Sequence, residues 1–364
     1  MKYKLEDICN RIYSGGTPST IHKEYWNGDL PWLSSGETSQ RFVYTTEKFI
    51  TKEGVQKSST KYAKRNSTVM ASAGQGHTRG QVSFLMNDMY INQSVLVFEP
   101  EVSIVNPLYL YYNLDGRYEE LRQLSDGTST RGSLSGRIVK GMEIDLPNLS
   151  VQGKIVSVLY DIDKKIENNN QINRNLSEQL KVIFSKMFPT IADSGSNTLE
   201  EIISFSNGKK RPDTEGKVPV YGGNGILSYT DKSNAENCVI IGRVGAYCGS
   251  LYLSIEPCWI SDNAIKAEAK NSKSQMFIYY LLQELALSNR HIGTSQPLLT
   301  QGILNAIPFT CPSEEGIISF CKKADDIQKL IDMNTIENKR LSELRDTLLP
   351  KLMSGELDVS DLNI

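Results

Sequence analysis

Asp161-Ile162-Asp163 recurs 165 positions later as Asp326-Ile327-Gln328, and Leu176-Ser177-Glu178 recurs at the same interval as Leu341-Ser342-Glu343. Both copies lie in runs of residues whose apolar positions are spaced four and three apart. This spacing is typical of a helix that packs along one narrow seam. The sequence therefore contains one long helix twice, and a duplication of the whole chain is the simplest explanation.

The repeat continues toward the amino terminus with a changing offset. Residues 5–8 (LEDI) match 199–202 (LEEI) at an offset of 194, and the glycine-rich residues 76–80 (GHTRG) match 245–249 (GAYCG) at an offset of 169. The first copy therefore carries about 25 extra residues between these points. Copies that keep one frame and differ in their loops indicate one scaffold that recognises two different things.

The helical seams are apolar with a few exceptions. Arg345 falls on the second seam, and we expect the neighbouring Leu344 to take its place in the contact. The first seam comprises Ile155, Leu159, Ile162, Ile166, Asn169, Asn173, Leu176, Leu180, Ile183 and Met187. The second comprises Phe320, Ala324, Ile327, Ile331, Asn334, Asn338, Leu341, Arg345, Leu348 and Leu352.

Two asparagines lie at the middle of each seam. If the helices pair in opposite directions, Asn169 lies beside Asn338 and Asn173 beside Asn334. Such pairs would fix the register, because a slipped helix leaves a buried amide without a partner. The alternative is a solvated, frayed midpoint. Parallel pairing would also match these residues, so the antiparallel direction follows from the duplication, in which a two-fold axis separates the two domains.

The rest of the sequence alternates short β-branched and aromatic runs with glycine-rich turns and two short helices near 107–123 and 275–288. The predicted segments are a globular domain (1–150), a central spacer helix (151–188), a second globular domain (189–312) and a C-terminal spacer helix with its tail (313–364). The predicted fold class is α+β. Two similar mixed α/β domains are joined by two long helices that form an antiparallel coiled coil with pseudo-two-fold symmetry.

The composition is that of an ordinary globular protein. The 364 residues are 39% hydrophobic, and 40 basic against 42 acidic side chains give a net charge of −2. No apolar run approaches the roughly 20 residues of a membrane span, and a signal-peptide pattern is absent, so we expect a cytoplasmic protein without a membrane contact. Six cysteines without a C-x-x-C pair favour buried thiols over a metal site or disulfide framework.

Three stretches resemble enzyme motifs. Residues 106–109 (NPLY) are similar to the N-P-P-Y/F pocket of amino-methyltransferases, but the second proline is missing and Asn106 followed by Pro107 is a good helix start. The glycine-rich residues 74–80 and 242–245 lead into strands and lack G-K-[ST], which excludes a nucleotide-binding loop. Residues 221–225 (YGGNG) predict a tight hairpin. We predict no catalytic residue.

The same glycine loops suit close approach to a nucleic acid, because glycine lets backbone N–H groups reach phosphates while neighbouring polar side chains reach base edges. The alternative is a plain strand connection with solvated charges. Residues 209–211 (KKR) are the densest basic cluster, and Arg137 lies beside the Gly-Thr-Ser loop that both copies share. The predicted DNA-contacting residues are Thr17, Ser34, Ser35, Gln75, Gly76, His77, Arg79, Thr130, Arg131, Lys209, Lys210, Arg211, Tyr221, Asn224, Arg243, Tyr247, Ser295 and Gln296.

Nearly the whole chain resembles the DNA-specificity subunit of a Type I restriction-modification system. The resemblance depends on residues 14–18 (SGGTP), 25–32 (YWNGDLPW), 219–225 (PVYGGNG), 241–245 (IGRVG) and 348–357 (LLPKLMSGEL). It implies two target-recognition domains that each read one half of a split, asymmetric site in double-stranded DNA. The spacer helices would set the length of the unread gap. The second domain lacks the Gly-Gly-Thr-Pro segment, so the two half-sites should differ.

The resemblance also implies partners. Two methyltransferase subunits would use S-adenosylmethionine to methylate adenine N6, and two restriction subunits would use ATP and Mg²⁺ to translocate and cleave DNA. This chain would bind no cofactor itself and perform no chemistry. Two alternatives are a methyltransferase with its own recognition domains, which lacks its motifs here, and a coiled-coil scaffold with two protein-binding heads. Salt would distinguish the scaffold, since phosphate-driven binding weakens steeply as salt rises.

Overall fold

The structure is a computed structural model that describes residues 2–74, 76–126, 133–192, 195–271, 274–293 and 296–359. It divides into two compact units. Unit 1 comprises Met1–Glu167 and Asn338–Ile364, and unit 2 comprises Asn168–Glu337. The two long helices, α6 (Leu149–Met187) and α9 (Glu314–Ser354), each contribute one half to each unit. None of the helices in the described ranges is long and apolar enough to cross a membrane.

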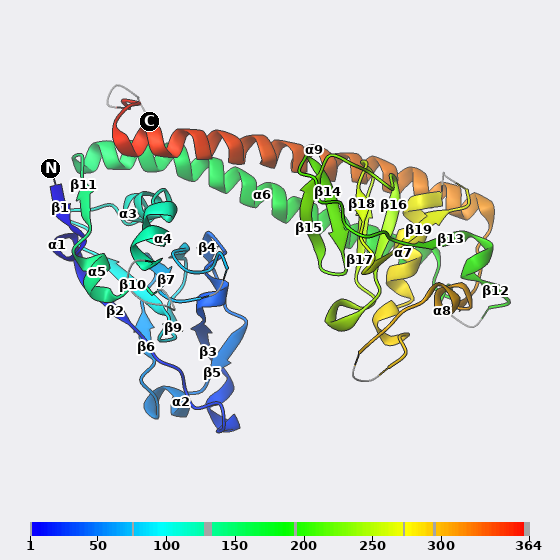
Figure 1. The fold of residues 1–364 in the computed structure, drawn as a ribbon, viewed down its shortest axis with the longest axis horizontal. Helices are drawn as coiled ribbons and strands as arrows, with labels where there is room; N and C mark the ends of the chain where they lie inside the picture. Colours follow the sequence, from blue (N-terminus) through cyan, green and yellow to red (C-terminus); the bar gives the residue numbers. More distant parts are fainter. Residues whose placement is uncertain are drawn as a thin grey trace. The chain divides into compact units, whose positions relative to one another are not determined.

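Unit 1 contains a five-stranded sheet, a four-stranded sheet, a two-stranded sheet and several short helices among its described residues (Figure 1). Its strands are β1 (Lys2–Lys4), β2 (Cys9–Ser14), β3 (Trp26–Leu33), β4 (Phe42–Val43), β5 (Lys48–Ile50), β6 (Lys61–Ala63), β7 (Thr68–Ala71), β8 (Val82–Leu85), β9 (Met89–Ile91), β10 (Val95–Pro100) and β11 (Glu143–Asp145). Its helices are α1 (Leu5–Ile8), α2 (Lys52–Gln56), α3 (Pro107–Asp115), α4 (Tyr118–Asp126) and α5 (Gly136–Lys140). The sheet orders are β2-β10-β7-β8-β4 and β5-β3-β9-β6, and β1 pairs with β11.

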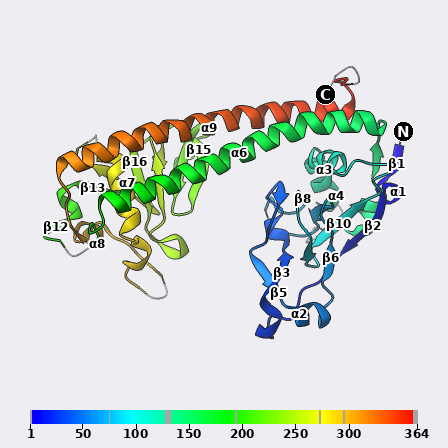
Figure 2. The same ribbon diagram turned by 180° about the vertical axis from the view of Figure 1, so that it is seen from behind.

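Unit 2 repeats this arrangement with fewer strands (Figure 2). Its strands are β12 (Asn197–Thr198), β13 (Ile203–Asn207), β14 (Val218–Gly222), β15 (Gly225–Thr230), β16 (Cys238–Gly242), β17 (Leu251–Ser254), β18 (Trp259–Ile260), β19 (Ala264–Ala269) and β20 (Pro308–Phe309). Its helices are α7 (Gln275–Glu284) and α8 (Gln301–Asn305). The sheet orders are β13-β19-β16-β17 and β15-β14-β18, and β12 pairs with β20.

The strand pairings match between the units. The antiparallel order β2-β10-β7-β8 corresponds to β13-β19-β16-β17, and the parallel pair β3·β9 corresponds to β14·β18. The register agrees as well, since Leu33 pairs with Ile91 in unit 1 and Tyr221 pairs with Ile260 in unit 2. The sequence repeat is therefore a repeat of structure. β15 pairs antiparallel with β14 as β5 does with β3, so the elements of unit 1 without a counterpart among the described residues of unit 2 are β4, β6 and α2.

In each unit, one helix of the globular part packs against the segments of α6 and α9 that belong to that unit. In unit 1, Tyr111 and Leu114 of α3 share a core with Leu159 of α6 and Leu352 of α9. In unit 2 the core is aromatic, and its members include Phe277 of α7, Phe184 of α6 and Phe320 of α9. The Phe184 and Phe320 rings lie 5.1 Å apart at their centroids. Burial of these large apolar side chains is the main force that attaches each domain to its helices.

The start of α3 confirms the helix-cap interpretation of residues 106–109. Asn106 Oδ1 accepts hydrogen bonds from the backbone N–H groups of Leu108 and Tyr109 at 3.0 and 3.3 Å, and Pro107 occupies the first turn. This asparagine therefore satisfies helix donors. The cysteines follow expectation in part, because five are buried free thiols and Cys311 is exposed.

A buried polar cluster joins α3, α6, α9 and the residue before β4 in unit 1. The Asp163 carboxylate of α6 is 3% exposed and accepts hydrogen bonds from Tyr112 Oη at 2.8 Å and Arg345 Nη1 at 2.8 Å, and Arg41 Nε lies 3.3 Å away. Arg41 Nη1 also contacts Asp115 Oδ2 at 2.9 Å. Burial raises the pKa of Asp115, and Arg41 opposes the shift. Two arginines and two aspartates thus face each other inside the unit, and Arg345 also pairs with Asp346, through Nη2 and Oδ1 at 2.8 Å.

The seam prediction for Arg345 was wrong. Arg345 is 9% exposed and lies in the contact, whereas Leu344, which was expected to replace it, is 48% exposed. The physical reason is Asp163, which gives the guanidinium a buried partner that a single-helix pattern does not reveal.

The two seam asparagines of α6, Asn169 and Asn173, form hydrogen bonds with α9 within unit 2. Asn334 Nδ2 donates to Asn173 Oδ1 at 2.8 Å, and Asn169 Nδ2 donates to Glu337 Oε2 at 2.7 Å. Residue numbers rise along α6 while they fall along α9, so these segments run in opposite directions within the unit. Asn169 is 1% exposed, which excludes the solvated alternative for this residue. Asn338, its expected partner, belongs to unit 1.

We predict that Asp163→Ala lowers the free energy of unfolding by about 1–3 kcal/mol, because Arg345, Arg41 and Tyr112 lose a shared buried acceptor while Arg41 keeps Asp115 and Arg345 keeps Asp346. The matched control is Asp161→Ala, which removes an exposed carboxylate two residues away and should cost less than about 0.5 kcal/mol. Denaturant unfolding of both variants measures the difference. Equal unfolding midpoints would show that the cluster contributes nothing to stability.

Candidate nucleic-acid interface

Two glycine-rich turns of unit 2 lie against each other. Gly223 and Asn224 form the two-residue turn between β14 and β15, so the predicted hairpin is present. The turn lies one residue earlier than the predicted Asn224-Gly225 turn. Ser250 Oγ donates to the Gly223 carbonyl at 2.5 Å. A Cβ built on Gly223 would lie 3.6 Å from Gly242 Cα and 3.7 Å from Tyr247 Cβ. Asn224, which is exposed, is therefore presented beside residues 243–249.

Residues 243–249 are also held from the other side by the segment before α8. Gly245 N donates to Pro297 O at 3.0 Å, and Leu299 N donates to Arg243 O at 2.9 Å. These bonds place Arg243 next to the segment that contains Gln296, which is exposed. Tyr247 is 50% exposed. Within the described residues, Arg243 Nε is buried and has no hydrogen-bond partner.

The basic cluster begins on the same edge of unit 2. Lys209 N donates to Ile260 O at 3.0 Å, and Ser261 N donates to Tyr221 O at 2.9 Å, so backbone bonds connect the start of residues 209–211 to the end of β14. Lys209, Lys210 and Arg211 are all exposed. The structure thus brings the described predicted residues of the second domain together, from four segments separated by up to 87 positions in sequence.

The corresponding glycine loop of unit 1 has the same backbone form. Gly76 and Gly80 have φ values of +59° and +87°, and their counterparts Gly245 and Gly249 have +70° and +86°. Left-handed φ values strongly favour glycine, which explains why the two loops keep glycines at equivalent positions. The side chains between them differ, with His77 and Arg79 in one loop and Ala246 and Cys248 in the other.

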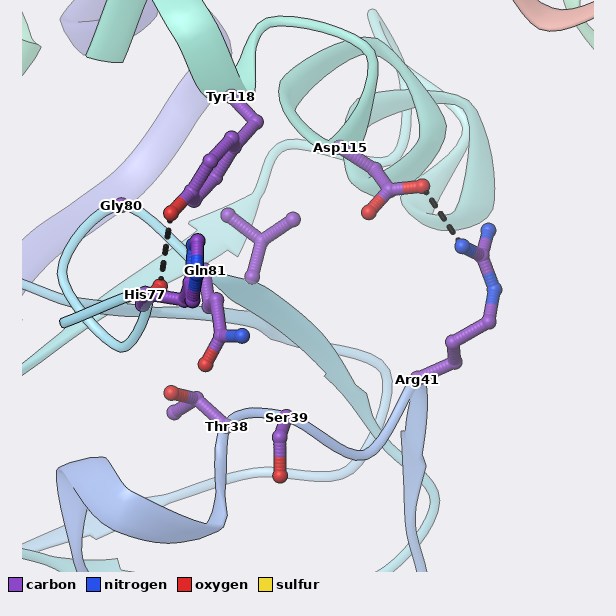
Figure 3. A pocket seen from close by; sticks show the side chains of 9 residues that line it. Thr38, Ser39, Arg41, His77, Gly80, Gln81, Asp115 and Tyr118 are labelled. Atoms are coloured by element: carbon purple, nitrogen blue, oxygen red, sulfur yellow. Dashed lines mark hydrogen bonds and ion pairs between the residues drawn. The ribbon is translucent and has the colours of Figure 1, made fainter. Parts of the chain in front are cut away.

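A hollow of about 360 Å³ lies beside this loop of unit 1 (Figure 3). Tyr118 Oη donates to His77 O at 2.9 Å and closes one side, while the Arg41–Asp115 ion pair closes the other. The lining residues are Thr38, Ser39, Arg41, His77, Gly80, Gln81, Val82, Asp115 and Tyr118. Arg122 of α4 supports the loop through a 2.9 Å hydrogen bond from Nη1 to Gly76 O.

Several predicted contacts of the first domain serve its own structure. Arg79 is 8% exposed and pairs with Asp126, so its guanidinium is turned inward. Thr17 Oγ1 donates to Gln93 Oε1. Ser34 Oγ donates to Glu37 Oε2 at 3.0 Å, in the short turn where the Ser35 carbonyl accepts from Thr38 Oγ1 at 2.8 Å. Gly76 and His77 are exposed.

Four predicted site residues lie outside the described residues: Gln75, Thr130, Arg131 and Ser295. Sequence reasoning missed Tyr118 and Arg122, which hold the loop from α4. Their segment reads as an ordinary polar surface helix, and no local signal connects it to a loop about 40 positions earlier. It also missed Gln81, whose amide points into the hollow (Figure 3).

Comparisons with known proteins agree with this arrangement. Residues 1–178 and 193–346 match the family model described as Type I restriction modification DNA specificity domain. The chain is 26% identical to the Type I restriction enzyme MjaIX specificity subunit of Methanocaldococcus jannaschii, over 99% of this chain and 94% of that protein. It is 23% identical to the HindI specificity subunit of Haemophilus influenzae, over 76% and 84%. The crystal structure of a Type I restriction-modification S subunit from M. genitalium shares the fold with a TM-score of 0.57 at 19% identity, over 99% of this chain and 96% of that one.

The two glycines of the second loop should respond differently to alanine. Gly245→Ala should cost about 1–2 kcal/mol of stability, because its φ is positive but no atom lies within 4 Å of the added Cβ. Gly249→Ala should cost a further 1–3 kcal/mol or so, because its Cβ would lie 2.4 Å from Ser288 N and the backbone must move. Thermal unfolding of the two variants measures this order. A reversed order would contradict the assigned loop geometry.

Proposed function

Because the chain belongs to the family of Type I restriction modification DNA specificity domains, we propose that it is the DNA-specificity subunit of a Type I restriction-modification complex and performs no chemistry itself. The observation that carries the proposal is the repeated frame with unequal loops. Both units hold a left-handed glycine loop at the same place, and the two loops present different side chains. A frame of this kind fits two recognition surfaces of different specificity.

In this proposal the two target-recognition domains (1–150 and 189–312) read the two halves of a split, asymmetric site in double-stranded DNA. In the second domain, Arg243 is the side chain best suited to base recognition, because a guanidinium can donate two hydrogen bonds to guanine O6 and N7. Its Nε lacks a partner among the described residues. Lys209, Lys210 and Arg211 would contact phosphates, which position the domain without reading sequence.

The spacer helices (151–188 and 313–364) would set the distance between the half-sites as an antiparallel coiled coil. Helices of about 38 residues span roughly 55 Å, which exceeds one DNA turn of about 34–36 Å. The asparagine pair Asn173–Asn334 and the contact of Asn169 support a fixed register, because a slip of one helix would bury amides against apolar residues. Asn338 would join them across the seam.

The partners in this proposal are two methyltransferase subunits and two restriction subunits. The methyltransferase subunits would supply S-adenosylmethionine chemistry on adenine, and the restriction subunits would use ATP and Mg²⁺. No cofactor would be bound by this chain, and the complex would act in the cytoplasm. This chain would contribute the choice of DNA sequence and the spacing of the two half-sites.

The test is co-expression of the chain with the methyltransferase subunit encoded beside it, followed by long-read mapping of N6-methyladenine in the host DNA. The expected result is a split motif that is methylated on opposite strands across a fixed gap. A stable complex that methylates no motif would contradict the proposal. A catalytically inactive methyltransferase subunit is the control for background methylation.

We predict that inserting one heptad into each spacer helix at matched positions widens the unread gap and leaves both half-sites unchanged. Seven residues add about 10 Å, which is about three base pairs at 3.4 Å each. The readout is the methylated motif of the variant complex. A changed half-site with an unchanged gap would contradict the spacer role.

We predict that Arg243→Gln relaxes recognition at one base pair of the second half-site and leaves the first half-site unchanged. Loss of a bidentate contact to guanine costs about 1–3 kcal/mol, or roughly 5- to 150-fold in discrimination. The matched control is Lys210→Gln, which should weaken binding to all sequences equally because phosphate contacts carry no sequence information. Methylation mapping and competition binding separate the two outcomes.

A further inference from the structure

A second hollow of unit 1, of about 520 Å³, opens between β2 and α5. β2 is an edge strand of its sheet, so α5 packs beside it without another strand between them. Figure 1 shows α1, β2 and α5 together at one end of this domain. The lining residues are Glu6, Ile12, Tyr13, Ser14, Leu96, Gly136, Arg137, Lys140 and Gly141.

The rim of this hollow is basic. Arg137 is exposed and Lys140 is half-buried, and neither forms an ion pair in the part of the chain that the structure describes. Two further cations lie around Tyr13, with Arg11 Cζ 4.5 Å and Lys61 Nζ 5.9 Å from its ring centroid. Glu6 is the one carboxylate among the lining residues. Two cations, Arg137 and Lys140, therefore line a concave surface that holds one acid, and Arg11 and Lys61 lie near its Tyr13 together with the carboxylate of Glu99.

The hollow adjoins the end of the domain that carries the glycine loop. Ser14 lines it and leads directly into Gly15 and Gly16, whose N–H groups bond to Asn92 O and Ile91 O. The segment that enters α5 is bonded to the start of the glycine loop, since Leu134 N donates to Ser72 O at 2.8 Å. A DNA duplex that contacts the loop would therefore have its backbone within reach of α5.

Unit 2 lacks these cations at the equivalent positions. The counterparts of Arg137 and Lys140, 165 positions later, are Gly302 and Asn305 of α8. In the segment that follows the edge strand, the basic residues are in unit 2 instead. The two segments are equivalent, because Gly16 N donates to Ile91 O in unit 1 and Lys209 N donates to Ile260 O in unit 2. At that place unit 1 has Gly-Thr-Pro and unit 2 has Lys-Lys-Arg. Each domain thus has one basic element next to its loops, and the two domains use different elements.

We propose that the hollow between β2 and α5 binds the phosphodiester backbone of DNA beside the first half-site. Arg137 and Lys140, the two cations of the lining, contact the phosphates. The inference rests on the proposed function and assigns the phosphate anchor of the first domain, which its sequence does not mark with a basic run. Because phosphates are the same in every sequence, this anchor sets position and affinity and carries no base specificity.

The experiment uses the full chain in complex with its methyltransferase subunits and a labelled duplex that contains the mapped motif. Affinity is measured from about 50 to 200 mM salt for the wild type and for Arg137→Gln/Lys140→Gln. Each lost phosphate contact reduces the slope of log K against log salt by about 0.9, so the double variant should lose about 1.8 from the slope. It should bind about tenfold more weakly or worse at low salt. Its methylated motif should stay the same.

Three controls make the result specific. Lys322→Gln/Lys323→Gln removes two exposed cations from α9 and should leave the slope unchanged. Glu6→Gln removes the carboxylate of the hollow and should bind DNA as tightly as the wild type or more tightly. Gly302→Arg/Asn305→Lys places two cations at the equivalent positions of α8 in unit 2. If these positions face the DNA backbone, the slope of log K against log salt should become steeper.

The outcomes separate the two proposals. If the wild-type complex binds and methylates a split motif but Arg137→Gln/Lys140→Gln keeps the wild-type slope, the phosphate anchor is wrong and the specificity role stands. If the double variant loses its methyltransferase subunits and keeps its DNA slope, the hollow is a protein contact and the anchor is wrong. If the wild type shows no motif, the proposed function itself fails.

Discussion

The carboxylate of Asp163 is the constraint on which unit 1 depends. It lies inside the unit and is shared by Arg41, Tyr112 and Arg345, which come from three different parts of the chain. An ion pair of this kind gives little net stability, because desolvation offsets the attraction. It does give direction, since hydrogen bonds to a planar carboxylate hold α3, α6 and α9 at one mutual position. Burial and the Asp163 charge both raise the pKa of Tyr112, so its phenol stays protonated and donates.

The same place in unit 2 has no charged side chain at the two equivalent helix positions. The counterparts of Asp163 and Arg345, at the 165-residue offset, are Gln328 and Leu180, and Leu180 is fully buried among aromatic side chains. The tyrosine is retained as Tyr280, in the same core. In unit 1 the long helices are therefore attached partly by directional hydrogen bonds, whereas in unit 2 the attachment depends on the buried apolar area and the fit of the side chains. Unit 1 also places Arg41, the residue before β4, beside Asp163 and Asp115 as a second cation of the cluster.

Periodicity and repetition predicted the frame well. The heptad spacing located both long helices, the Asn-Pro start of α3 was identified as a cap, and the equivalent glycines have the same left-handed φ. Predictions failed where a distant segment decides the outcome. Arg345 was judged on a seam of one helix, although Asp163 of the other helix gives its guanidinium a buried partner. The DNA contact of Arg79 stays a prediction, but the ion pair of its guanidinium with Asp126, 47 positions away, was not foreseen from its glycine neighbours. Short-range patterns record spacing and backbone form, and they do not record such pairings.

The loops can vary because their shape depends on backbone bonds. In unit 2 the positions of Arg243, Asn224 and Lys209 are fixed by hydrogen bonds between main-chain groups and by glycine contacts that leave no room for a Cβ, as at Gly208 and Gly249. A substitution at an exposed loop position therefore changes what is presented without removing a core contact. Main-chain atoms therefore set the shape of these loops, and the exposed side chains set what the loops present. A duplicated frame can in this way keep two equal folds while its two surfaces diverge.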